Sequence, residues 1–147
     1  MTNEEVVRRY ATAQMNLDFD TLASLRHADW CAVWPQSGEV VNGSEDMRAI
    51  SEHYPGGAPR LTKQERLVGS EDRWVTSPVG GAYRVTGEGE NWWGEWQLQY
   101  PDGRTWQTII LVELRDGKGW RETQYWAEPF DPPEWRAEWV DRTPPAN

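Results

Sequence analysis

Apolar and aromatic residues recur through residues 92–128 in strand-like runs, which predict β-strands. Two turn signals divide the stretch: Pro-Asp-Gly-Arg at residues 101–104 and Arg-Asp-Gly-Lys at residues 115–118. Asp and Gly are the residues that best tolerate the positive φ angles of a two-residue hairpin loop. The pattern therefore predicts a three-stranded antiparallel meander.

If each Asp-Gly pair forms a loop, the register of the meander is fixed. Leu98 then lies opposite Gln107, and Leu111 lies opposite Glu122. Since side chains alternate between the faces of a sheet, one face combines tryptophans with a carboxylate and amides, and we expect the functional site there. This face is predicted to carry Trp92, Trp96, Leu98, Gln107, Ile109, Leu111, Glu113, Trp120, Glu122, Gln124 and Trp126. The opposite face is suited to contact with a second copy.

Helical spacing of apolar residues predicts a first helix over residues 3–16, capped by Asn3. Its stripe consists of Val6, Val7, Tyr10, Ala11, Ala13 and Gln14. A short second helix is predicted over about residues 20–26, with Asp18 or Asp20 as its cap.

Residues 30–34 and 39–42 have the pattern of two short strands joined by a turn. A third helix is predicted to begin at Ser44 and to end at the Pro-Gly-Gly of residues 55–57. The side of this helix that we expect to be buried carries Met47, Ile50 and Tyr54.

Strands dominate the second half of the chain. The pattern turns to strand from Leu61, with one long or broken strand expected over residues 65–75 and the next over residues 79–86, ahead of the meander. Because the helices are segregated from an antiparallel sheet, the predicted fold class is α+β.

The composition predicts one soluble domain. A chain of 147 residues has room for a single core and a pocket. It contains no run of eighteen apolar residues, and its N-terminus is charged and helical rather than a signal peptide, so we expect a cytoplasmic location. Cys31 is the only cysteine, which excludes a disulfide framework.

The charge and the tryptophan content narrow the function. A formal net charge of −9 would repel a phosphate backbone, so nucleic-acid binding is not expected. Eleven tryptophans supply large rigid apolar surfaces that suit cores, pockets and interfaces. We expect several of these rings to line a pocket for a small hydrophobic molecule, with no cofactor and no metal.

The last residues form a separate segment. Residues 1–130 are expected to make one domain, and residues 131–147 a proline-rich C-terminal extension. Trp135 and Trp139 lie four positions apart in this extension, so one side of a helical turn could dock on the body or on a partner.

An ordered series of motifs carries a family resemblance. It comprises VVRRY in the first helix, DFDTL in the second, a Trp-Pro-x-Ser-Gly turn at residues 34–38 before Gly43, and the Asp-Gly-Lys turn of the meander. Over roughly residues 4–130 the chain resembles the nuclear transport factor 2-like superfamily, and within it the SnoaL-like group.

The resemblance implies a cone-shaped fold, in which a curved antiparallel or mixed sheet wraps around three α-helices from the N-terminal half. It implies a pocket at the open end and a homodimer formed through the outer face of the sheet. Members of the superfamily include ketosteroid isomerases, epoxide hydrolases, dehydratases, polyketide cyclases and non-catalytic binding proteins, so the fold does not decide the function.

Ketosteroid isomerase allows a comparison by position. Tyr10 matches the tyrosine that donates a hydrogen bond to the substrate oxyanion in that family, and Trp126 matches an aromatic residue of the last strand. The family's catalytic aspartate precedes a proline, where this chain has Trp34 before Pro35. Its protonated aspartic acid corresponds to Leu111. Both carboxylates used in steroid isomerisation are therefore missing.

Glu122 is the leading candidate for chemistry. A carboxylate among indole rings loses hydration, which raises its pKa toward the range useful for general acid–base catalysis. The alternatives are that Glu122 faces outward, or that it pairs with an arginine such as Arg84.

Other residues are expected to hold the substrate or to assist. Tyr10, Gln107 and Gln124 could orient a ligand, although Tyr10 could equally be a core tyrosine. The predicted wall consists of Trp34, Gln36, Tyr54, Trp96, Ile109, Leu111 and Trp126. His53 could act as a base near neutral pH, or could simply cap the third helix.

Three functions remain open from the sequence. The first is a cofactor-independent acid–base enzyme of the isomerase, dehydratase, cyclase or hydrolase type, acting on a small hydrophobic, aromatic or polycyclic molecule. The second is a non-catalytic binding module with the same pocket. The third is a structural or dimeric interaction subunit, which requires a cone filled by its own side chains.

Overall fold

The structure, a computed structural model, describes residues 1–69, 73–76, 82–85 and 89–142, and only the backbone of residues 73–76 and 82–85. The helices are α1 (Asn3–Asn16), α2 (Phe19–Leu25) and α3 (Ser44–Glu52). The main sheet has the order β2-β1-β8-β7-β6-β3. Its strands are β1 (Arg26–Trp34), β2 (Glu39–Asn42), β3 (Arg60–Gly69), β6 (Asn91–Gln99), β7 (Thr105–Arg115) and β8 (Lys118–Ala127).

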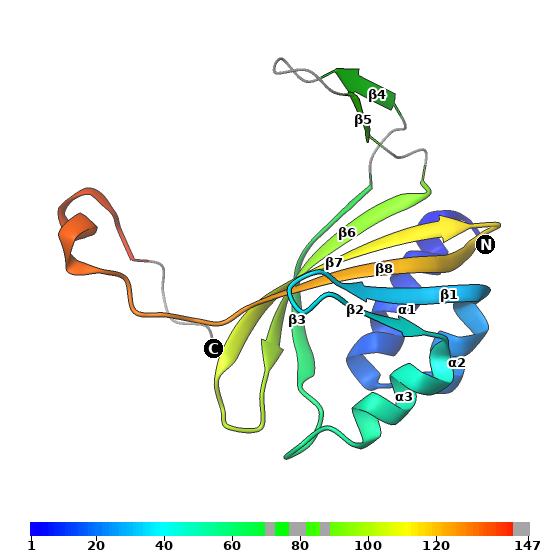
Figure 1. Ribbon diagram of the computed structural model, residues 1–147, viewed down its shortest axis with the longest axis horizontal. Coiled ribbons are helices and arrows are strands. Elements are labelled where there is room, and N and C mark those ends of the chain that lie inside the picture. Colours follow the sequence, from blue (N-terminus) through cyan, green and yellow to red (C-terminus); the bar gives the residue numbers. More distant parts are fainter. Residues whose placement is uncertain (70–72, 77–81, 86–88, 143–147) are drawn as a thin grey trace.

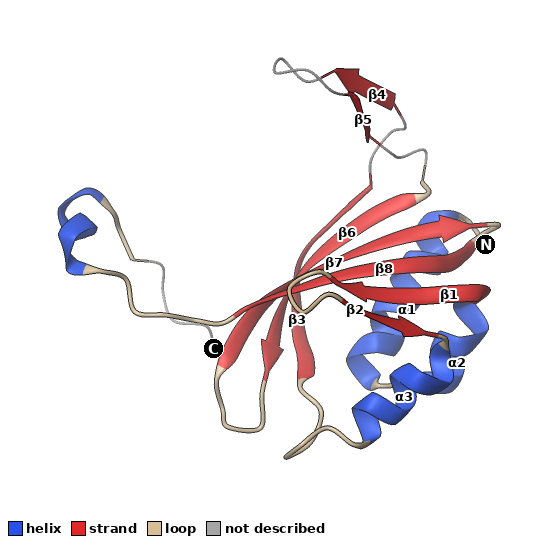
Figure 2. Cartoon of the chain, viewed as in Figure 1, coloured by secondary structure: helices blue, strands red, loops and turns tan. Residues whose placement is uncertain are grey.

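The curved sheet covers the helices on one side, and all three helices lie against its inner face (Figure 1). Strand β1 runs parallel to β8, whereas the other neighbouring strands are antiparallel, so the sheet is mixed. Figure 2 shows α1, α2 and α3 as one group beside the strands of the main sheet, and these helices precede most of the strands along the chain. The predicted α+β class and the cone-like arrangement are confirmed.

Helix α1 has the predicted bounds but a different cap. Thr2, and not Asn3, is the N-cap: its hydroxyl accepts a hydrogen bond from the Glu5 amide at 3.2 Å, and Glu5 accepts one from the Thr2 amide at 2.6 Å. This reciprocal pair is a capping box. Asp18 caps α2, as predicted, by accepting a hydrogen bond from the Thr21 amide.

The first hairpin of the meander has a longer loop than predicted. Gly103 N–H bonds the Tyr100 carbonyl and Tyr100 N–H bonds the Arg104 carbonyl, so three residues, 101–103, form the loop. Gly103 has a φ of 87°, whereas Asp102 does not adopt a positive φ, so the two-residue geometry is not reached. Leu98 therefore pairs with Trp106, not with Gln107, and the predicted register is wrong by one residue.

The second hairpin has the predicted loop. Asp116 and Gly117 both have positive φ, at 53° and 72°, and Arg115 pairs with Lys118. The register then shifts beyond Leu114–Gly119, so that Val112 rather than Leu111 lies opposite Glu122. The two one-residue shifts compensate between β6 and β8. The predicted faces of these two strands are therefore correct relative to one another, and the face of β7 is wrong.

The core lies between α1, α2 and the inner face of β6 and β7. Its buried residues include Val6, Val7, Tyr10, Leu22, Leu25, Trp96, Ile110, Val112 and Leu114. Burial of this apolar surface is the main contribution to stability. Helix α3 contributes no buried residue, because its apolar side, expected to be buried, faces a cavity instead.

Two parts of the chain project from the body. Strands β4 (Arg73–Thr76) and β5 (Ala82–Val85) pair only with each other, beyond one end of β3 and β6 (Figure 1). The strand predicted over residues 65–75, as one long or broken strand, is divided: β3 begins at residue 60, next to the expected start of the strand pattern at Leu61, and ends at residue 69, and β4 follows. Residues 70–72 and 77–81 lie outside the described part, as does residue 86.

The C-terminal extension leads away from the sheet and carries the short 3-10 helix η1 (Glu134–Trp139) (Figure 1). Trp135 and Trp139 are each 73% exposed, so neither docks on the body. Over the described ranges, none of the helices has the length and apolar character needed to cross a membrane.

Candidate functional site

A cavity of about 490 Å³ lies between the three helices and the inner face of the sheet. Most of its wall is apolar, formed by Leu17, Phe19, Leu22, Met47, Ile50, Leu61, Leu98, Trp106, Ile110 and Trp126. Its polar groups include Gln14, Arg26, Gln36, Ser37, Glu39, Thr108, Glu122 and Gln124. An apolar cavity of this size with a few convergent polar groups is typical of small-molecule sites.

The cavity has a closed end and a mouth. Glu122 is 0% exposed and Arg26 is 6% exposed, and both contribute to the closed end. Gln36, Ser37 and Glu39 are exposed and form part of the mouth. A ligand would therefore have its buried polar contacts at the end farthest from solvent.

Six of the predicted site residues line the cavity: Trp34, Gln36, Tyr54, Glu122, Gln124 and Trp126. Strand β8 supplies the last three at alternate positions, so they point to the same face.

The predicted β7 residues lie elsewhere. Gln107 is exposed, Ile109 is 42% exposed, and Leu111 is half-buried on the outer face of the sheet, so placing them in the pocket was wrong. The cause is the register: Trp106, Thr108 and Ile110 occupy the inner positions instead.

Trp96 and His53 are also outside the cavity. Trp96 is 2% exposed and packs in the core against α1. His53 is exposed, with Nδ1 at 2.7 Å from the Ala49 carbonyl oxygen at the C-terminal end of α3. This placement matches the capping alternative and not a base in the pocket.

The Glu122 carboxyl is held by two amides. Gln14 Nε2 donates to its Oε1 at 2.7 Å, and Gln124 Nε2 donates to its Oε2 at 3.1 Å. The Gln124 amide is oriented in turn by Trp34, whose Nε1 donates to Gln124 Oε1 at 2.9 Å. Tyr10 and Gln14 lie one helical turn apart on α1, so that the same stripe of α1 presents both polar groups to the sheet.

Burial raises the pKa of the Glu122 carboxyl above its ordinary value of 4.5. The positive charge of Arg26 lowers this pKa, as do hydrogen bonds from Tyr10 and Gln124, but desolvation is the larger effect. A carboxyl with a raised pKa is suited to both releasing and accepting a proton near neutral pH. Of the two alternatives, outward orientation is contradicted, and the Arg84 side chain lies outside the described residues.

Tyr10 is buried behind the cavity and positions Arg26. Its hydroxyl accepts a hydrogen bond of 2.7 Å from Arg26 Nε, and its ring is 1% exposed. Desolvation, followed by the nearby charge of Glu122, raises the pKa of Tyr10 well above 10.0. The hydroxyl therefore stays protonated, and it does not line the cavity as a ligand contact.

Arg26 is the principal residue of the site that the sequence pattern does not indicate. Its Nη1 donates to Ser44 Oγ at 3.2 Å, and its guanidinium carbon lies 3.7 Å from the centre of the Trp30 ring. The predicted first strand begins at Trp30, and Arg26 falls at the end of the predicted second helix. Had the strand been extended back to residue 26, Arg26 would share the even-numbered, inward parity of Trp30 and Trp34.

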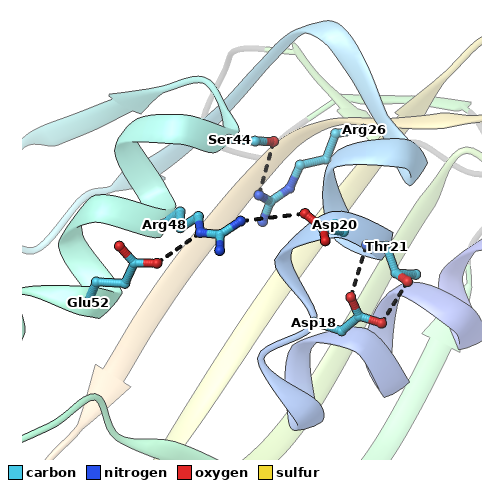
Figure 3. Close-up of polar contacts among 7 residues, drawn as sticks. All are labelled: Asp18, Asp20, Thr21, Arg26, Ser44, Arg48 and Glu52. Carbon is cyan, nitrogen blue, oxygen red and sulfur yellow. Dashed lines mark hydrogen bonds and ion pairs between the residues drawn. The ribbon is translucent and has the colours of Figure 1, made fainter.

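The helices around this arginine are joined by further polar contacts. Figure 3 shows Arg48 of α3 between Asp20 and Glu52, at 3.4 Å and 2.8 Å. The Arg26–Ser44 bond lies beside this group (Figure 3). These contacts hold α2 and α3 together over one side of the cavity.

The mouth is aromatic. Trp34 and Trp126 meet edge to face with ring centres 5.2 Å apart, and Tyr100 lies 4.5 Å from Trp106. Gln36 exchanges two hydrogen bonds with the Trp126 backbone, at 2.7 Å and 3.0 Å. These hydrogen bonds attach the turn after β1 to the part of β8 that carries Trp126.

No group of three His, Cys, Asp or Glu side chains that could hold a metal occurs within the described ranges.

Comparison with known proteins shows which solved structures share this fold. No protein-family model and no curated protein sequence matches the chain. A nuclear transport factor 2-like protein of unknown function from Burkholderia xenovorans is 28% identical, with 97% of this chain and 95% of that chain covered and a TM-score of 0.64.

Two further solved structures are similar. A candidate ketosteroid isomerase from Kribbella flavida is 23% identical, with 97% of this chain and 90% of that chain covered and a TM-score of 0.72. A candidate polyketide cyclase from Pseudomonas putida is 20% identical, with 85% and 91% covered and a TM-score of 0.58.

Proposed function

Since this chain has the nuclear transport factor 2-like fold, we propose that it is a cofactor-independent acid–base enzyme that acts on a small, largely hydrophobic molecule. The observation that carries the proposal is a fully buried carboxyl, Glu122, at the closed end of a cavity of about 490 Å³. Names of two similar structures, for a ketosteroid isomerase and a polyketide cyclase, are consistent with chemistry of this kind.

Glu122 would transfer the proton. Two amide N–H groups and the Tyr10 hydroxyl donate to its oxygens, and an ionised carboxylate offers about four lone-pair sites, so about one acceptor position remains for a substrate proton. In the ionised form Glu122 would remove a proton from the substrate, and in the neutral form it would return the proton at another atom. These two proton transfers together isomerise the substrate. The ionised and neutral forms of Glu122 could equally serve elimination of water or ring closure.

The site differs from that of a steroid isomerase. Trp34 stands before Pro35 in place of the catalytic aspartate. The inward residues of β7 near Glu122, Ile110 and Val112, are also apolar, so the corrected register supplies no second carboxylate there. Glu122 would therefore act without a carboxylate partner from these positions.

The wall supports an aromatic or polycyclic substrate. Indole and phenol rings surround the mouth, and rings favour stacked or edge-to-face packing against one another. The open cavity also weighs against a purely structural subunit, which requires a cone filled by its own side chains.

A generic proton-abstraction probe tests the proposal without knowledge of the substrate. In 5-nitrobenzisoxazole a base removes the proton from C3, the ring N–O bond breaks, and a coloured cyanophenolate forms. We expect the protein to accelerate this reaction by about 100-fold or more over buffer, as a positioned general base does. Glu122→Gln should abolish the acceleration, because its amide cannot accept the proton.

The control is Glu113→Gln. Glu113 is a carboxylate on the outer face of the same sheet, 3.6 Å from Arg121, and its loss should leave the rate unchanged. Quenching of tryptophan fluorescence by the probe would establish binding separately. Binding without acceleration by the unaltered protein would refute the catalytic proposal and favour a non-catalytic binding module.

A further inference from the structure

We infer that the molecule bound in this cavity carries a carboxylate group, and that Arg26 binds this group at the closed end. The inference rests on the proposed function, because it names the substrate class of the same cavity. Three observations carry it: the free side of the guanidinium, the charge around it, and the shape of the cavity.

One side of the Arg26 guanidinium is hydrogen-bonded to neighbouring side chains, and the other side lies against the cavity. Nε bonds the Tyr10 hydroxyl and Nη1 bonds the Ser44 hydroxyl. Within the described residues Nη2 donates no hydrogen bond, yet it is not sealed by protein, and Arg26 lines the cavity. The arginine is only 6% exposed, so its free N–H groups face the cavity rather than bulk solvent.

The charge of Arg26 forms no ion pair within the described part of the chain, and it interacts with Glu122 only at longer range. No Asp or Glu of the described ranges lies within the 4.0 Å of an ion pair from it. Its two hydrogen-bond partners are neutral hydroxyls, and the Trp30 ring at 3.7 Å contributes only a cation–π contact. Burial raises the pKa of Glu122, whereas the Arg26 charge lowers it, and Glu122 does not form a close ion pair that would occupy the guanidinium.

A purely structural role does not account for this arrangement. Linking Tyr10 to Ser44 needs only two of the donors, and a buried cation without an ion-pair partner at contact distance is costly. A ligand carboxylate supplies what is missing, because a guanidinium donates charge-assisted hydrogen bonds to it. The apolar part of the ligand would then extend between Leu98 and Ile110 toward the aromatic mouth.

A matched pair of ligands tests the inference: 2-naphthoate and 2-naphthalenemethanol, which share a ring system and differ in charge. Titration calorimetry at neutral pH should give an affinity at least about 10-fold higher for the acid, as expected for a charge-assisted pair. The net charge of −9 opposes anion binding in general, so this preference must come from a local cation.

The variant Arg26→Gln should lose the preference for the acid while keeping the affinity for the alcohol. Arg66→Gln, which removes an exposed arginine of β3 that does not line the cavity, should keep the preference. Arg26→Lys retains the charge and should keep part of the preference for the acid. If Arg26→Gln does not fold, an undiminished preference in Arg26→Lys would contradict binding by the guanidinium.

Equal affinities for acid and alcohol in the unaltered protein would overturn the inference, as would an acid preference that survives Arg26→Gln. Failure of both molecules to bind would overturn it too. None of these results bears on the proposed function, because the benzisoxazole reaction depends on Glu122 and on a neutral probe.

Discussion

At the scale of single residues, the environment of Glu122 is the feature on which the function depends. Its neighbours come from three elements: Gln14 and Tyr10 from α1, Arg26 from β1 and Gln124 from β8. The amides satisfy the carboxyl oxygens in a site without access to bulk water, so the group can be buried without losing all of its hydrogen bonds. This satisfaction makes a buried, titratable acid compatible with a stable fold.

Burial of Glu122 has a consequence for stability. Its pKa is higher in the folded protein than the ordinary 4.5, so the folded state binds the proton more tightly than the unfolded state. The stabilising contribution is therefore complete below the unfolded pKa and is lost as the pH rises through the folded pKa. Glu122→Gln, which does not titrate, should gain stability relative to the unaltered protein as the pH rises.

Urea unfolding between about pH 5 and about pH 9 measures the difference in free energy of unfolding between Glu122→Gln and the unaltered protein. The matched control is Glu113→Gln. Its free energy of unfolding should not gain on that of the unaltered protein in the same way as the pH rises. A difference for Glu122→Gln that shrinks with rising pH would contradict a raised pKa.

At the scale of secondary-structure elements, local signals allowed the helices and the outline of the meander to be predicted. The α1 bounds, the Asp18 cap and the β2 bounds followed from periodicity and capping residues. The register of β7 did not follow, because Pro-Asp-Gly is compatible with both a two-residue and a three-residue loop. Only the backbone angle at Asp102 distinguishes them.

The second irregularity depended on tertiary packing. The shift in the β7–β8 register begins next to Gly119, where an added Cβ would lie 3.1 Å from Tyr10 Cε2. No local pattern shows that the ring of a distant helix needs this space. Glu122 was nevertheless found, because its strand and β6 kept their common face, whereas Gln107, Ile109 and Leu111 were misplaced.

Gly119→Ala tests this link between the strand and the site. The added methyl group should displace Tyr10, lower the free energy of unfolding by about 1 kcal/mol or more, and weaken naphthoate binding through the Tyr10–Arg26 contact. Lys118→Ala, at an exposed position one residue earlier, should do neither. Unfolding and binding titrations on both variants would decide, and unchanged naphthoate affinity in Gly119→Ala would contradict the link.

At the scale of the whole molecule, the curved sheet leaves one face for the cavity and the other for solvent or a partner. The outer face carries Ile109 and Tyr125, which pair across β7 and β8 and are each 42% exposed. We propose that a second copy covers this face, as the family resemblance implies. Apolar area exposed at the centre of a sheet is typical of an interface.

Ile109→Glu should then shift the protein toward the monomer, because the introduced carboxylate would be buried without a partner. Sedimentation velocity over a range of concentrations measures the change. Thr12→Glu, at an exposed position on α1 across the molecule, provides the matched control. A monomer in the unaltered protein, or a dimer that Ile109→Glu leaves intact, would contradict this arrangement.

The central claim, that Glu122 is the buried group that transfers the proton, is tested most directly by the pH dependence of benzisoxazole cleavage. The rate of the unaltered protein minus that of Glu122→Gln isolates the contribution of this carboxyl. We expect it to rise with pH along a single titration curve whose midpoint lies above 4.5, since only the ionised carboxylate accepts the proton. Equal rates for the two proteins at every pH, or a midpoint at or below 4.5, would contradict the claim.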